Sequence, residues 1–147
     1  MAGRPITRAR RQMLDEAGED KIFEMYVELG SVSRLMDKVV GRPPGVSEHS
    51  WGRADFYKWL RQTPERWERW QQAKLDRGHV EADMIAEVAE EVTPETSGMA
   101  RVKIDAHKWR AERLNRQEYG PPQAQVNVGV AVQVGQAWLE ALRTMQE

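Results

Sequence analysis

The stretch that decides the fold is TPERWERWQQAKLDRGHVEADMIAEVAEEV, residues 63–92, followed by the turn sequence TPETSG, residues 93–98. Thr63 is a good helix N-cap and Pro64 suits the first helical position, so a long helix is predicted from there to about Val92. A second helix is predicted over Met99–Gln117, with an apolar stripe at helical spacing. Two long helices joined by a short turn form an antiparallel helical hairpin, so the fold class is predicted to be mainly α.

Working outward toward the N-terminus, the sequence predicts a cluster of short helices. Gly30 is expected to end one helix and Ser31 to cap the next, while residues 41–52 have the Gly and Pro content of a loop. Phe56, Trp59 and Leu60 mark the packing side of the last short helix. The predicted ranges are Asp15–Leu29, Ser31–Val40 and Arg53–Gln62.

A DNA-binding role is the functional interpretation of this N-terminal part, residues 1–62. Three short helices with a sharp turn resemble a helix-turn-helix module, and residues 1–12 are predicted to be a mobile basic arm. The alternative is that the same cations are solvated faces of an ordinary helical cluster behind a disordered leader. The candidate DNA-binding residues are Arg4, Arg8, Arg10, Arg11, Arg53, Tyr57, Lys58 and Arg61.

Beyond the hairpin, residues 126–134 alternate valine with small or polar residues, which is the period-two pattern of a β-strand. A single strand has two open edges, so we expect other copies of the chain to supply its partners and close an inter-subunit barrel in a ring oligomer. The alternative is pairing with a weak local segment near Ala124. The valines that would form the barrel are Val126, Val128, Val130, Val132 and Val134.

The last part of the chain, Gln136–Gln146, is predicted to be a short amphipathic helix with Trp138, Leu139 and Leu142 on one side. Three units are therefore expected: a DNA-binding domain over residues 1–62, a helical-hairpin oligomerisation domain over 63–122, and a strand with a C-terminal tail over 123–147. No run of apolar residues is long enough for a membrane span, so no membrane partner is expected.

Composition argues against an enzyme. The chain of 147 residues contains no cysteine, and it lacks the glycine-rich phosphate loop with its lysine that ATP hydrolysis needs. Asp76, His79 and Asp83 share a helical face, but exposed polar residues take such spacing by chance, so no metal site is assigned. No catalytic residue and no cofactor is predicted.

An acidic cluster near the end of the long helix allows two interpretations, a solvated face or an inter-subunit partner for Arg101, Lys108 and Arg110. The cluster consists of Glu87, Glu90, Glu91 and Glu95.

Several segments together resemble the small terminase subunits of tailed bacteriophages. The run FYKWL, residues 56–60, is followed by PERW, residues 64–67, and by the acid-rich helix Ala82–Glu91. More specific is ARVKIDAHKWRAERLNRQEYG, residues 100–120, a basic helix with a Lys-Trp pair that ends in Tyr-Gly. The leading Gly3-Arg4-Pro5 also occurs in relatives, and the resemblance covers roughly residues 20–122.

This resemblance implies a homo-oligomeric ring that binds the packaging-initiation site of viral double-stranded DNA in the host cell cytoplasm. The ring would recruit a large terminase subunit that holds the ATPase and nuclease. Arg53, Lys58 and Arg61 would contact DNA, and residues 126–134 would form the barrel. Trp70, Ile85, Val88, Val102 and Trp109 would belong to the assembly hairpin, and Trp138, Leu139 and Leu142 would dock the large subunit.

Two other functions are compatible with the same residues. A helix-turn-helix transcription regulator would act as a small dimer on a short palindrome with half-sites about one helical turn apart. A structural adaptor without a DNA role would use its arginines only for solubility. A packaging ring should instead bind long DNA with a steep salt dependence.

Overall fold

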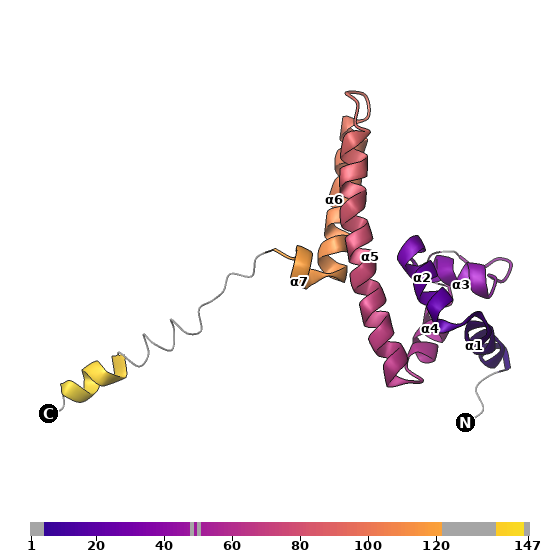
Figure 1. The fold of residues 1–147 in the computed structure, drawn as a ribbon, viewed down its shortest axis with the longest axis horizontal. Coiled ribbons are helices and arrows are strands. Elements are labelled where there is room, and N and C mark those ends of the chain that lie inside the picture. The colour runs from indigo at the N-terminus through magenta and orange to yellow at the C-terminus, as the bar shows by residue number, and fades with distance from the viewer. Residues whose placement is uncertain (1–4, 48, 50, 122–137, 146–147) are drawn as a thin grey trace.

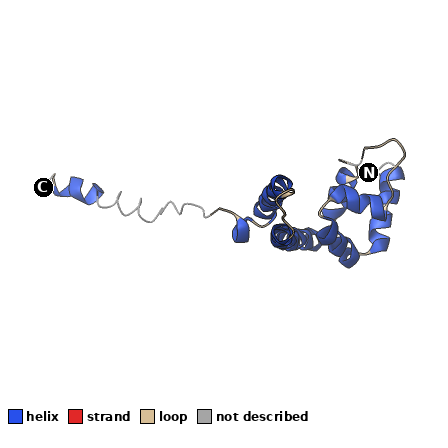
Figure 2. Ribbon diagram, turned by 90° about the horizontal axis from the view of Figure 1, so that it is seen from above, coloured by secondary structure: helices blue, strands red, loops and turns tan. Residues whose placement is uncertain are grey.

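The computed structural model describes residues 5–47, 49, 51–121 and 138–145, and within these ranges the secondary structure is helical without strands. Short helices α1 to α4 pack beside one end of a long hairpin made of α5 and α6, and α7 lies at the foot of α6 (Figures 1 and 2). The mainly α prediction is confirmed, while the valine strand of residues 126–134 lies outside the described residues. The helices are α1 Pro5–Ala17, α2 Glu19–Leu29, α3 Val32–Val39, α4 Arg53–Leu60, α5 Pro64–Glu90, α6 Ser97–Leu114 and α7 Arg116–Tyr119, and residues 138–144 are also helical.

The predicted mobile arm is wrong from Pro5 onward, because these residues form α1 and pack on the other short helices. Arg10 donates to the Asp55 carboxylate at 2.7 Å and lies 5.3 Å from the ring centre of Trp51. Leu14 is fully buried in the core. A basic segment thus becomes ordered because a nearly buried acid more than forty residues away provides its partner.

The single helix predicted over residues 15–29 is also wrong. Gly18 has a φ of 85°, which a right-handed helix cannot contain, so α1 ends at Ala17 and α2 starts at Glu19. The chain turns at this glycine, which lets Leu14 of α1 and Ile22 of α2 enter the same core.

The caps predicted for α3 and α5 are confirmed. The Ser31 hydroxyl accepts from the Arg34 amide at 3.4 Å, and the Thr63 hydroxyl accepts from the Arg66 amide at 3.2 Å with Pro64 in the first helical turn. Gly30 ends α2 in the left-handed conformation, as expected for a C-cap. Local side-chain chemistry therefore fixes where these helices begin and end.

The main hydrophobic core crosses the predicted boundary between residues 62 and 63. Phe56 and Trp59 of α4 pack with Tyr26 of α2, and Trp70 and Ala73 of α5 complete the same cluster. Trp70 is only 2% exposed and lies 4.3 Å from the ring of Tyr26. The first turns of α5 therefore belong to the N-terminal module as well as to the hairpin.

The hairpin itself is confirmed, since α5 and α6 run side by side with a turn at residues 91–96. The second helix is shorter than predicted, because it ends at Leu114 rather than continuing to Gln117. Asn115 breaks it by capping α7, where its side-chain oxygen accepts from the Glu118 amide at 3.2 Å. None of the helices in the described part of the chain is long and apolar enough to span a bilayer.

Candidate nucleic-acid interface

The outer face of α4, together with its C-cap residue Arg61, presents three cations. Arg53, Lys58 and Arg61 are exposed, and none of them forms an ion pair within the ranges that the structure describes. The opposite face of the helix holds Phe56 and Trp59, which are fully buried. Because the buried face fixes the helix on the core, the three cations are available to an anionic partner.

Trp59 is held from both sides, which fixes α4 firmly. Its indole nitrogen donates to the Asp15 carboxylate at 2.8 Å, and the Arg66 guanidinium lies 4.1 Å from its ring centre. Arg66 in turn donates to the Glu19 carboxylate at 3.0 Å and to the backbone carbonyl of Trp59 at 2.9 Å. Helices α1, α2 and α5 therefore all contribute to the position of α4.

Tyr57 differs from the other α4 candidates because it is half-buried. Its ring packs edge-on against Phe56 and Trp70, with centroid distances of 6.0 and 6.2 Å. Tyr57 therefore packs beneath the cations of α4 and is less available for contact with DNA than they are.

The predicted arginines of α1 have different environments. Arg8 is exposed, whereas Arg10 is engaged by Asp55 and Arg11 is half-buried, with a 3.4 Å hydrogen bond to the Thr7 carbonyl. Arg4 lies outside the described residues. Among the described arginines of the predicted basic arm, Arg8 is thus the one that is exposed enough to contact DNA.

A polar groove of about 350 Å³ lies between the short helices and the hairpin, and sequence reasoning missed it. Arg34 of α3 and Arg53 of α4 line one side, and Arg110 of α6 lines the other. The residues come from three helices far apart in sequence, so no local motif could reveal them. Its full lining is Leu29, Gly30, Ser31, Arg34, His49, Arg53, Arg77, Glu81 and Arg110.

The floor of this groove is a buried network around Glu81. Arg77 donates to one oxygen of the Glu81 carboxylate at 2.7 Å, and the His107 ring nitrogen lies 2.6 Å from the other. Arg110 approaches the same carboxylate at 3.4 Å. Burial alone would raise the pKa of Glu81, but the hydrogen bonds from His107 and Arg77 and the positive charges of Arg77 and Arg110 outweigh it and lower the pKa.

Arg77 also links this network to the N-terminal module. It donates to the backbone carbonyls of Val27 and Glu28, both at 2.7 Å, and so caps the C-terminal end of α2. Because these partners balance the charge of Glu81, the guanidinium groups of Arg34 and Arg53 make the mouth of the groove positively charged. A phosphate group is the natural ligand of such a set of guanidinium groups.

The hairpin residues predicted for oligomerisation divide into two sets. Val102 and Trp109 are exposed on α6, while Ile85 and Val88 are half-buried on α5 and Trp70 is in the core. In the helix over residues 138–144, the predicted docking residues Trp138, Leu139 and Leu142 are all exposed. His79, considered for a metal, lies 2.6 Å from the hydroxyl of Tyr119.

The described residues thus define a helical protein in which a module of short helices with a cationic outer helix is fused to a long hairpin. The model of the family described as "Bacteriophage Sf6, terminase small subunit-like" matches residues 47–126, which is more than half of the chain. The chain therefore belongs to this family, and the resemblance read from residues 56–120 is confirmed. The match contains α4, the whole hairpin and α7. No curated protein and no solved structure matches the chain.

Proposed function

We propose that this chain is the DNA-recognition subunit of a phage genome-packaging terminase, acting without catalysis of its own in the cytoplasm of the infected cell. The family match over α4 and the hairpin carries this proposal. Arg53, Lys58 and Arg61 would contact the phosphates of viral double-stranded DNA, and the groove of Arg34, Arg53 and Arg110 would hold a further phosphate. Exposed cations on a helix fixed by its buried face support this assignment.

The assembly part of the proposal concerns residues 63–147. The hairpin and the valine strand would build a homo-oligomeric ring, in which many weak DNA contacts add up through avidity. Val102 and Trp109 are 68% and 58% exposed in the single chain, and burial of such large apolar side chains between subunits would favour assembly. Trp138, Leu139 and Leu142 would then be free to recruit the large terminase subunit.

The DNA-binding proposal is tested by replacing Arg53, Lys58 and Arg61 together with alanine. The salt dependence of binding to long double-stranded DNA should become shallower by about 2 to 3 in the slope of log K against log salt. The matched control replaces Lys21, Arg116 and Arg143, three exposed cations elsewhere, and removes the same charge. Equal slopes for the two variants would overturn the assignment of α4.

A further inference from the structure

Helix α6 has two apolar faces, although a hairpin helix needs only one. Ala100 and Ala111 are buried against α5, whereas Met99, Val102 and Trp109 are 67%, 68% and 58% exposed. Their spacing of three and seven residues puts these three side chains on one stripe. Val102 and Trp109 lie opposite the buried alanines, and Met99 is at the edge of the stripe, where it also lines a pocket with Val88 and Val92. A stripe of this kind on a surface helix indicates a partner.

The exposed stripe of α6 is flanked by cations. The Arg113 guanidinium lies 4.7 Å from the ring centre of Trp109, so charge and apolar surface are joined in one patch. Against these cations α6 carries only Asp105 and Glu112 as acids. The five cations of α6 are Arg101, Lys103, Lys108, Arg110 and Arg113.

A second unpartnered surface has the opposite charge. A groove of about 520 Å³ between α2 and α5 has an apolar floor that includes Phe23, Val27 and Ala73. Acids form most of its rim, and Glu24 and Glu28 have no ion pair within the described ranges. The acids at the rim are Asp20, Glu24, Glu28 and Asp76.

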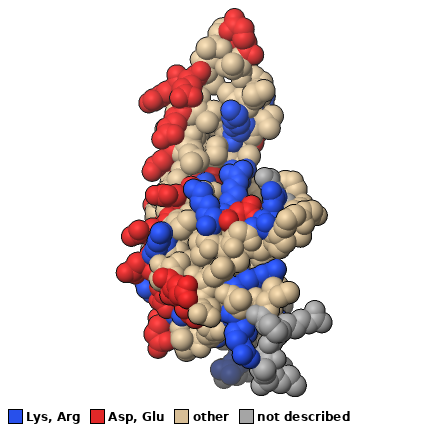
Figure 3. Space-filling model, turned by 90° about the vertical axis from the view of Figure 1, so that its right-hand side faces the viewer, with Lys and Arg blue, Asp and Glu red and all other residues tan. Residues whose placement is uncertain are grey.

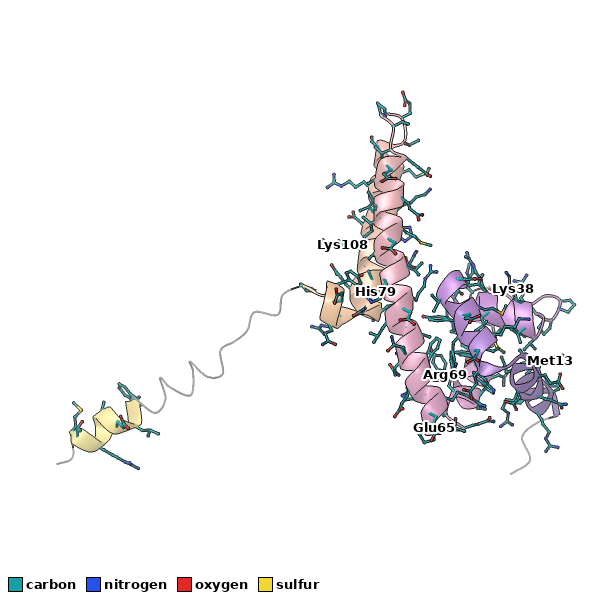
Figure 4. The ribbon with its side chains drawn as sticks, viewed as in Figure 1. Met13, Lys38, Glu65, Arg69, His79 and Lys108 are labelled. Carbon is teal, nitrogen blue, oxygen red and sulfur yellow. The ribbon has the colours of Figure 1, made fainter. Side chains whose placement is uncertain are left out.

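The acidic surface continues along α5. Asp83, Glu87 and Glu90 follow Asp76 at helical spacing, and Figure 3 shows acidic side chains along one edge of the molecule, from the hairpin down to the short helices. Arg69 is a cation at this groove, and it is already engaged by Glu19 at 2.9 Å and by Asp20. Figure 4 shows Arg69 on the part of α5 beside the short helices, with Lys108 on the other side of the hairpin.

The two surfaces lie on different sides of one subunit. On α5, Asp76 lines the groove, while Glu81 faces α6 through its contact with His107. Residues five apart on a helix are about 140° apart around its axis, so the groove and the α6 side do not coincide. The α6 stripe of a subunit therefore cannot be covered by the groove of the same subunit.

We propose that the occupant of the α2–α5 groove is α6 of a second copy of this chain. This inference rests on the proposed assembly and specifies its interface. The stripe of Met99, Val102 and Trp109 would cover the apolar floor, and the α6 cations other than Arg110 would meet the acidic rim. Because two different surfaces are joined, the contact is head-to-tail and generates a ring when the rotation closes. Helix α2 of the DNA-binding module then forms part of every subunit contact.

Charge decides between this occupant and two others. A symmetric pairing of α6 with α6 would bring together two helices that each carry five cations and only two acids, which is repulsive. The exposed helix at residues 138–144 has an apolar face, but Arg143 is balanced by Glu140, so it offers the acidic rim no net positive charge.

The test uses two variants, each of which disables one surface. Glu24, Glu28 and Asp76 changed to arginine disable the groove, and Val102→Glu with Trp109→Glu disables the stripe; all five side chains are exposed, so each variant should fold. In native mass spectrometry, each change should raise the dissociation constant of the assembly at least about tenfold. Mixing the two variants should restore a one-to-one contact, because each retains the surface that the other has lost. Arginine at Glu16, Glu68 and Glu118, three exposed acids outside the groove, is the matched control and should assemble as the unchanged chain does.

A second readout locates the contact. Because the chain has no cysteine, Glu24→Cys in one copy and Arg113→Cys in another should form a disulfide under mild oxidation. A disulfide of Glu24→Cys with Arg143→Cys instead would assign the groove to the C-terminal helix and overturn the inference. A wild-type oligomer whose groove variant assembles normally would overturn this interface alone, whereas a monomeric wild-type chain would overturn the proposed ring as well.

Discussion

Glu81 is the residue on which the junction between the two parts of the molecule depends. It is 1% exposed, and Arg77, His107 and Arg110 converge on its carboxylate from α5 and α6. Removing one partner of a buried ionic group leaves the others uncompensated, which is far more costly than losing a surface pair.

We therefore expect Glu81→Gln to lower the free energy of unfolding by about 3 kcal/mol at neutral pH. The folded pKa of Glu81 lies below its ordinary value of 4.5, so its stabilisation is present above that pH and is lost as the pH falls through the lower folded pKa. Urea unfolding of the two proteins should show a difference that narrows in acid. An equal difference at all pH values would contradict the ionic origin of the effect.

Gly30 gives a second prediction at the same scale. Its φ is 68°, and a Cβ atom there would lie 2.5 Å from the Arg77 guanidinium carbon. Gly30→Ala should thus destabilise the protein by about 1 to 3 kcal/mol, through backbone strain and displacement of Arg77. Gly98→Ala is the control, because a Cβ there meets nothing within 4 Å and the residue is helical. Thermal unfolding should show a lower melting temperature for Gly30→Ala than for Gly98→Ala, and equal melting temperatures would contradict the prediction.

At the scale of elements, α1 behaves as part of the core and not as an arm. Its Arg10 neutralises Asp55, which is 8% exposed at the start of α4. Deleting residues 1–12 should cost about 1 to 3 kcal/mol of stability, because it leaves this acid without its partner. Deleting residues 1–4, which keeps α1 whole, is the control. A melting temperature that is equal for both deletions would contradict the structural role of α1.

The elements also show what the sequence could predict. Ser31 and Thr63 accept from backbone amides of the helices that they begin, and Pro64 suits a first helical turn, so these helix starts could be predicted from neighbouring residues. The fold of α1 depends on Asp55, and the groove depends on Arg34, Arg53 and Arg110 meeting from three helices, so neither could be read from neighbouring residues. The family resemblance placed Trp70 in the assembly hairpin, but its side chain is buried in the core of the short helices.

At the scale of the whole molecule, burial is uneven along the hairpin. No residue from 82 to 99 is buried, whereas α5 below this region holds Trp70, Ala73, Arg77 and Glu81 in buried positions. Few buried contacts mean low local stability. We expect backbone amides of residues 84–99 to exchange hydrogen quickly in dilute, dissociated protein and to become protected as the concentration rises. Protection that is independent of concentration would contradict a role for the hairpin in assembly.

Helix α5 has a mechanical consequence. It runs without a break for 27 residues from Pro64 to Glu90, a length of about 40 Å. Its first turns are part of the core that holds α4, and its later turns carry α6. Because the buried stretch of α5 from Trp70 to Glu81 joins the two parts without a break, we expect the short-helix module and the base of the hairpin to move as one rigid body. A force on the short helices would in this way rotate the base of the hairpin together with them.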